Sequence, residues 1–135
     1  MNRALARENA FLLIFEGISK TDEVAEEIFE KAVEYRGIEC DDYVKQVFFG
    51  VNENKKIITE ELDKHTVGWN KNRISKVSYA ILSLSAYEIM FMPDIPGKVS
   101  INEAVNLAKK YDDEKAYSFV NGVLNSLVKA VRENG

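Results

Sequence analysis

Residues 75–91 read SKVSYAILSLSAYEIMF, and this stretch decides the fold. Its apolar side chains recur at helical spacing and surround much of a helix circumference. They are Val77, Ala80, Ile81, Leu84, Tyr87, Ile89 and Phe91. A helix that is apolar on nearly every side has to be covered by other elements. The stretch therefore predicts a central, largely buried helix.

The N-terminal part of the chain predicts two amphipathic helices. Apolar side chains follow a helical repeat over residues 2–16, where Asn2 is placed to cap the first amides and Gly17 to end the helix. Between Thr21 and Gly37, an apolar stripe lies opposite a row of glutamates. Each helix would therefore bury one face and expose the other.

A third helix is predicted after Asp41 or Asp42, either of which can cap it. Its apolar stripe continues to His65, which indicates one long surface helix. Residues 69–74 predict a short turn or helix that leads into the central helix.

Two prolines, Pro93 and Pro96, enforce a loop after the central helix, because proline disfavours helical geometry before it and lacks an amide donor. Ser100 and Glu103 then have the spacing of a capping box. We expect a helix to begin there and to reach Lys110.

The last helix is expected after Asp112 or Asp113, and one apolar stripe runs along it for more than three turns. Gly122 lies in its middle, where glycine costs about 1 kcal/mol relative to alanine. Such a glycine usually permits the close approach of another helix.

These segments predict a single all-α domain over residues 1–135, with about seven helices and loops short enough for neighbours to pack antiparallel. Two helical subdomains that share one core are expected, at about 1–65 and 66–135. No strand pattern competes with this interpretation.

Composition narrows the classes of function. A single cysteine excludes an internal disulfide and is typical of a reducing compartment. The N-terminus has no secretory pattern, and no apolar run is long enough to span a membrane, so we expect a cytoplasmic protein. The net charge of −4 disfavours non-specific electrostatic binding to nucleic acid over a large surface. Any nucleic acid would therefore have to bind at a small, locally basic part of the surface.

No catalytic, cofactor or metal site is expected. His65 is the sole histidine and has no cysteine nearby, so the usual metal-ligand spacings cannot be assembled. Acidic neighbours of Cys40 should raise the pKa of its thiol and discourage thiolate chemistry. No glycine-rich turn precedes a lysine to hold phosphates.

Arg3 and Arg7 are the main candidates for binding. They are four residues apart on one helical face, near a helix end that attracts phosphate. The alternative is that the two arginines simply form a solvent-exposed helix face without binding a ligand. For Phe119, the alternative to a binding role is packing in the hydrophobic core. Four lysines lie late in the chain, and folding could bring some of them beside the arginines: Lys98, Lys109, Lys110 and Lys115.

Several motifs resemble those of one known family. They are ARENAFLLIF (6–15), WNKNRI (69–74), AILSLSAYE (80–88), DIPGKVSINEAVNLAKKY (94–111) and FVNGVL (119–124). In this order they are similar to the NusB family of transcription antitermination factors. The likeness spans nearly the whole chain, although residues 18–65 match in pattern rather than motif.

The resemblance implies a fold of two small helical bundles and a role in binding RNA without catalysis. Its partners would be the single-stranded boxA element of nascent RNA and NusE, the small-subunit ribosomal protein. The pair would join the antitermination complex on RNA polymerase and suppress premature termination, notably in ribosomal RNA operons.

The resemblance also implies an RNA-binding surface. Arg3 and Arg7 match the basic opening helix that meets RNA. Lys115, Ser118 and Phe119 match the start of the last helix at the RNA-facing edge. On this view the arginines hold phosphates, while Phe119 or another exposed aromatic stacks a base.

The chain departs from the family pattern in two places. Ala4 and Leu5 interrupt what is a run of arginines in related sequences, so we expect weak binding to RNA alone and dependence on NusE. Ser83 stands where the family often has arginine.

Three alternatives stay open. The chain could be an RNA-targeting module of the kind that precedes an RNA cytosine methyltransferase domain. It could be a helical protein-interaction adaptor without a role in RNA binding or antitermination. A homodimer that covers the RNA surface is the third.

Overall fold

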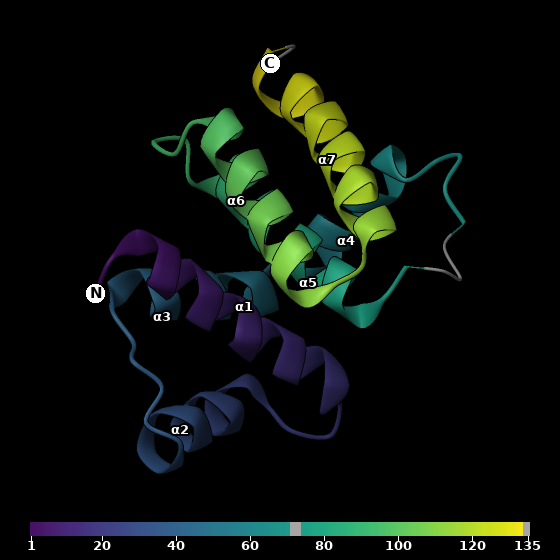
Figure 1. Cartoon of the computed structure of the whole chain (residues 1–135). Coiled ribbons are helices and arrows are strands. Elements are labelled where there is room, and N and C mark those ends of the chain that lie inside the picture. Colours follow the sequence, from purple (N-terminus) through teal and green to yellow (C-terminus); the bar gives the residue numbers. More distant parts are fainter. Residues whose placement is uncertain (71–73, 134–135) are drawn as a thin grey trace.

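The computed structural model describes residues 1–70 and 74–133 and places α5 (Lys76–Phe91) at the centre. Every residue from Ala80 to Ile89 is buried. Five other helices pack against α5 and cover it on several sides (Figure 1). The prediction of a central buried helix is therefore confirmed.

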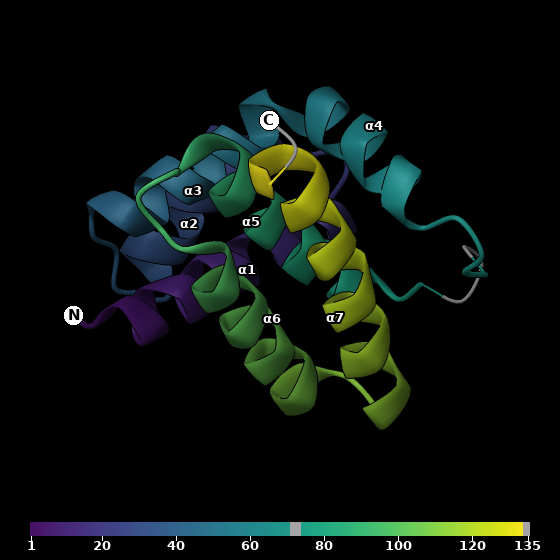
Figure 2. The ribbon, with the colours of Figure 1, turned by 90° about the horizontal axis from the view of Figure 1, so that it is seen from above.

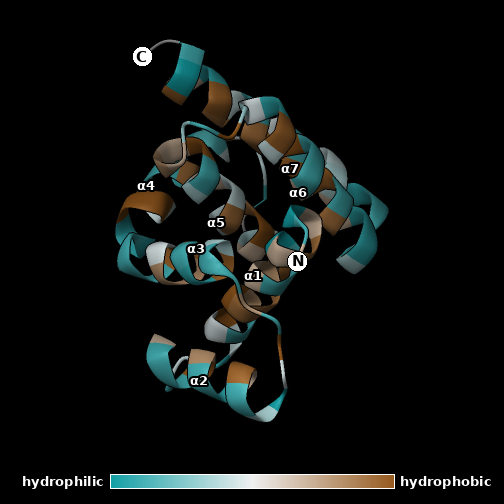
Figure 3. Cartoon of the chain, turned by 90° about the vertical axis from the view of Figure 1, so that its left-hand side faces the viewer, coloured by the Kyte–Doolittle hydropathy of each residue, from teal (hydrophilic) through white to brown (hydrophobic). Residues whose placement is uncertain are grey.

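The surrounding helices confirm an all-α fold, with no strand in the described ranges. They are α1 (Arg3–Ser19), α2 (Ala25–Tyr35), α3 (Asp42–Glu53), α4 (Lys55–His65), α6 (Gly97–Tyr111), α7 (Glu114–Val128) and a π-helical turn, η2 (Lys129–Glu133). In Figures 1 and 2, α6 and α7 form an antiparallel pair, and α6 lies between α1 and α7. Much of α2, at the edge of the molecule, is hydrophilic (Figure 3). No helix in the described part of the chain is long and apolar enough to cross a membrane.

Side-chain caps fix where several helices begin. Asn2, Asp41, Ser75 and Asp113 each accept a hydrogen bond from the backbone amide three residues later, at 2.8, 3.0, 2.9 and 3.0 Å. Each cap satisfies an amide that has no partner within its helix. The expected cap at Asn2 is confirmed, and the two open choices are settled as Asp41 and Asp113.

The long helix expected up to His65 is wrong, because the chain breaks at Asn54 into α3 and α4. Asn54 leaves helical geometry, with φ −110° and ψ 21°, and its side-chain amide donates to the Gly50 carbonyl at 2.8 Å. Such a local side-chain bond competes with the helical ladder. Nor is α3 a surface helix, since Val47 and Phe48 are fully buried. The stop expected at Gly17 is also wrong, because α1 continues to Ser19.

The capping box expected at Ser100 is wrong as well. Since α6 already begins at Gly97, Ser100 lies inside the helix and is fully buried. Its hydroxyl donates to the Glu88 carboxylate at 2.9 Å, a contact that sequence spacing does not reveal. The segment expected as a turn or helix at 69–74 falls largely outside the described residues.

Arg132 ties the C-terminal turn to the end of α5. Its guanidinium donates to the backbone carbonyls of Glu88, Ile89, Met92 and Ile95, at distances of 2.5 to 3.2 Å. The carbonyls of Glu88 and Met92 also accept from the backbone amides of Met92 and Ile95, so Arg132 adds a charged donor to the carbonyl-rich end of α5. This arrangement fixes the far end of α7 against the loop that follows α5.

Close helix approach occurs at Gly50 rather than at Gly122. A Cβ atom at Gly50 would lie 2.4 Å from the ring of Tyr87 on α5, so any larger residue there would force this packed ring to shift. A Cβ atom at Gly122 would lie 3.6 Å from the indole of Trp69, which is ordinary contact. The close approach expected at Gly122 is therefore wrong.

Alanine substitutions at these two glycines should have opposite effects on stability. We expect Gly50→Ala to lower the free energy of unfolding by about 1–3 kcal/mol, because the added methyl overpacks the core. Gly122→Ala should raise it by up to about 1 kcal/mol, because alanine favours the helix and meets no clash. Urea unfolding of both variants measures the difference, and equal destabilisation would contradict the packing described here.

Candidate nucleic-acid interface

The two arginines of α1 lie in different environments. Arg3 is exposed, and its guanidinium carbon lies 4.3 Å from the centroid of the Tyr43 ring, in a cation–π contact. Arg7, one turn later, is only 3% exposed. Helical spacing places both on one face, but only Arg3 presents its charge to solvent.

Arg7 belongs to a buried polar cluster around Glu88. The carboxylate of Glu88 is wholly inaccessible and accepts hydrogen bonds from Arg7 Nε at 2.9 Å, the Tyr43 hydroxyl at 2.5 Å and the Ser100 hydroxyl at 2.9 Å. Glu103 lies 3.7 Å from another nitrogen of Arg7. The cluster therefore links α1, α3, α5 and α6 through one carboxylate.

Electrostatics keep the donors of this cluster protonated. Burial lowers the pKa of Arg7, but the adjacent Glu88 carboxylate and Tyr43 outweigh burial and raise that pKa above its ordinary value. Burial and the negative charge of Glu88 also raise the pKa of the Tyr43 phenol well above its usual range. Arg7 and Tyr43 thus remain hydrogen-bond donors to Glu88 at neutral pH.

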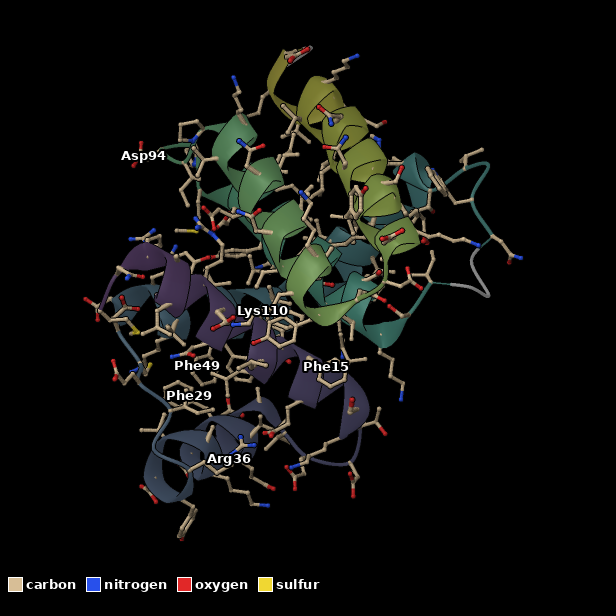
Figure 4. The ribbon with its side chains drawn as sticks, in the orientation of Figure 1. Phe15, Phe29, Arg36, Phe49, Asp94 and Lys110 are labelled. Carbon is tan, nitrogen blue, oxygen red and sulfur yellow. The ribbon has the colours of Figure 1, made fainter. Side chains whose placement is uncertain are left out.

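A groove of about 410 Å³ runs between α1 and α6. Lys110 lies at the end of α6 beside α1 (Figure 4), and its ammonium group contacts the Glu8 carboxylate at 2.5 Å. That hydrogen bond lowers the pKa of Glu8 and raises the pKa of Lys110. Leu5 and Asn106 also line the groove, which therefore combines apolar and polar contacts.

A second groove, of about 430 Å³, lies at the start of α7. Lys115 and Phe119 line it together with Trp69. Phe119 is only 7% exposed and meets the edge of the Trp69 ring, with the ring centroids 4.9 Å apart. Trp69 itself is 44% exposed. Ser118 is exposed on the same turn of α7.

The expected site residues thus fall into two groups. Arg3 and Arg7 lie on α1, while Lys115, Ser118 and Phe119 lie on α7, with α6 between the two helices (Figures 1 and 2). On α6, Lys110 contacts α1, and the ammonium of Lys109 lies 5.3 Å from the ring centroid of Tyr117 on α7. Arg7 therefore lines the groove between α1 and α6, and Lys115 and Phe119 line the groove at the start of α7, whereas Arg3 and Ser118 line neither.

Sequence reasoning missed two residues of this surface. Trp69 lies within a motif that carried the family resemblance, so its type and place signalled a role. Nothing in the sequence pairs Tyr43 with Arg3, because 40 positions separate them along the chain.

The NusB family model matches residues 4–129. The chain belongs to the NusB family. A protein named transcription antitermination protein NusB from Clostridium perfringens is 43% identical over 136 residues, covering 98% of this chain and all of the relative. One of the same name from Bacillus licheniformis is 43% identical over 127 residues, 94% of this chain and 96% of the relative. The resemblance inferred from the motifs is confirmed.

Solved NusB structures have the same fold. T. maritima NusB aligns with a TM-score of 0.85 at 30% identity, over 99% of this chain and 96% of that one. A crystal structure of the antitermination factors NusB and NusE in complex with dsRNA aligns at 0.82 and 31% identity, over 95% of this chain and 96% of that one. The all-α fold is therefore the NusB fold.

Other reactive side chains have structural roles in this NusB-family chain. The His65 ring bridges Glu61 and Ser126 at 2.9 and 2.7 Å, joining α4 to α7. Burial and the charge of Asp41 raise the pKa of the Cys40 thiol. No group of three or more potential metal ligands occurs among the residues that the structure describes.

Removing Arg7 should destabilise the fold far more than removing Arg3. Arg7→Met leaves the Glu88 carboxylate buried and unpaired, which should cost about 3–5 kcal/mol in the free energy of unfolding. The matched Arg3→Met loses only an exposed cation–π contact, about 0.5–1 kcal/mol. Chemical denaturation measures both, with the double variant Arg7→Met/Glu88→Gln expected to recover part of the loss. Similar values for the two single variants would contradict the role of the cluster.

Proposed function

We propose that this NusB-family chain is a transcription antitermination factor that binds single-stranded boxA RNA together with NusE. The observation that carries the proposal is the pair of grooves beside α6: exposed Lys110 lines the groove against α1, and exposed Lys115 and Trp69 line the groove at the start of α7. Single-stranded RNA requires both kinds of group, since cations hold its phosphates and aromatic rings stack its bases.

The residues of this surface divide into contacts and supports. Arg3 and Lys115 are exposed and would bind phosphates directly. Arg7 would act from beneath, because its buried bond to Glu88 fixes the helix that carries Arg3. Phe119 would likewise support the groove wall, and Ser118 would hydrogen-bond the RNA at its rim.

NusE would supply the positive surface charge that the chain lacks. With a net charge of −4, the chain presents few cations to RNA, and a basic ribosomal protein would enlarge the positive surface. Opposite charges would also speed the encounter of the two proteins. The pair would then act on RNA polymerase in the cytoplasm, without catalysing a reaction.

Loss of either proposed phosphate contact should weaken RNA binding. We expect Arg3→Ala or Lys115→Ala to lower the affinity for boxA RNA about two- to fivefold and to reduce the slope of log K against log salt by about 0.7. Fluorescence anisotropy of labelled RNA at several salt concentrations measures both effects. Lys31→Ala is the control, because Lys31 is exposed on α2 and pairs with Glu23. An equal loss in the control would show that the surface is wrongly placed.

NusE should strengthen RNA binding, and RNA should strengthen NusE binding by the same factor. Calorimetric titration of the chain with NusE, with and without boxA RNA, measures this coupling. Binding of NusE that is unchanged by RNA and independent of salt would instead indicate a protein-interaction adaptor. Sedimentation at several concentrations separates both outcomes from a homodimer that hides the surface.

A further inference from the structure

Trp69 is the accessible aromatic ring of the groove at the start of α7. Its side chain is 44% exposed, whereas Phe119 beneath it is only 7% exposed. A base can stack only on a ring whose face it can reach. If this groove binds a base, its stacking surface is therefore the indole of Trp69 and not the ring of Phe119.

The indole is supported by α7. The rings of Phe119 and Trp69 lie in an edge-to-face arrangement, with 71° between their planes, and Gly122 lies beside the indole at the next turn of the helix. A ring held in this way loses little conformational freedom when a base stacks on it.

The groove also has charged side chains in its lining, namely Lys115, Asp112 and Asp113. Lys115 can hold a phosphate. Asp112 is already satisfied, because its carboxylate accepts from the Ser75 and Ser78 hydroxyls at 2.6 and 2.9 Å and from the amide of Asp113 at 2.9 Å. These bonds outweigh burial and lower the pKa of Asp112.

Asp113 leaves one acceptor available. One of its carboxylate oxygens caps α7 by accepting from the amide of Ala116 at 3.0 Å. The other oxygen has no hydrogen bond from any residue that the structure describes, and the side chain is exposed beside the groove. A carboxylate accepts well from the amino group of a base such as cytosine and repels phosphate.

We propose that this groove binds one nucleobase of single-stranded RNA, with Trp69 as its stacking surface, Lys115 at its phosphate and Asp113 accepting from its exocyclic amino group. The inference rests on the proposed function, since it places one base of the same RNA. It extends that function by assigning a base site and a preference for cytosine over uracil.

The chain contains a single tryptophan, so its fluorescence reports on this groove alone. We expect a single-stranded oligocytidylate of twelve nucleotides to quench Trp69, with the same midpoint as anisotropy of the labelled RNA. Trp69→Leu should lower the affinity about 5- to 150-fold, which corresponds to the loss of one stacked base, about 1–3 kcal/mol. Trp69→Phe should retain most of it. Tyr35→Leu, which removes an aromatic residue 81% exposed on α2, should change nothing.

Asp113→Asn tests the base edge. Asparagine caps a helix as well as aspartate does, so folding should be preserved. Wild-type protein should prefer oligocytidylate to oligouridylate, and the variant should lose that preference. Equal affinity of the wild-type protein for the two oligonucleotides would remove Asp113 from the proposed site.

The outcomes separate this inference from the proposed function. RNA binding without a change in Trp69 fluorescence, or wild-type affinity in Trp69→Leu, would overturn the base site and leave RNA binding intact. Absence of RNA binding by anisotropy, with NusE present as well, would contradict the proposed function itself. Quenching of Trp69 by NusE without RNA would assign the groove to the protein partner; here Trp69→Phe serves as the blank for fluorescence from NusE.

Discussion

The structure depends on one buried carboxylate. Glu88 lies in the middle of the molecule with no access to solvent, so its charge has to be met by donors from the surrounding helices. Arg7, Tyr43 and Ser100 supply them from α1, α3 and α6. An orientation that separated any of these three donors from Glu88 would leave a buried polar group without its partner. The cluster thus selects one packing arrangement, even where apolar burial provides most of the stabilising free energy.

The same cluster connects the core to the surface. The ring of Tyr43 lies 4.3 Å from the guanidinium of Arg3 and 5.7 Å from that of Arg7, while its hydroxyl bonds Glu88. Tyr43 therefore has one end in the core and one face under an exposed cation. This arrangement restricts Arg3, so less conformational entropy would be lost in the phosphate contact proposed for it.

The sequence could predict what depends on local pattern. The buried circumference of α5 and the cap at Asn2 follow from helical periodicity and capping chemistry. Sequence pattern does not predict the burial or the hydrogen-bond partner of a side chain when the partner is distant in the sequence. Arg7 and Ser100 look like a surface cation and a helix cap until Glu88, 81 and 12 residues away, is brought beside them. The division into subdomains near His65 stays a prediction.

The candidate site follows the same rule. Family motifs identified α1 and α7, but the depth of each side chain depends on packing, which buries Phe119 against Trp69 and Arg7 against Glu88. Two of the residues that the motifs indicated for RNA contact, Arg7 and Phe119, are therefore buried, whereas Arg3 and Lys115 reach solvent.

An acidic chain that binds RNA with few cations gains little from the release of counterions, which is the usual source of affinity. Each contact then has to contribute more to the binding free energy, and this requires side chains that are held in place before binding. Supported groups such as Arg3 over Tyr43 and Trp69 over Phe119 meet this requirement. Through Tyr43, the polar cluster in the core restricts Arg3 of the proposed RNA-binding surface. The rigidity of such side chains would compensate for the low number of phosphate contacts, because less conformational entropy would be lost on binding.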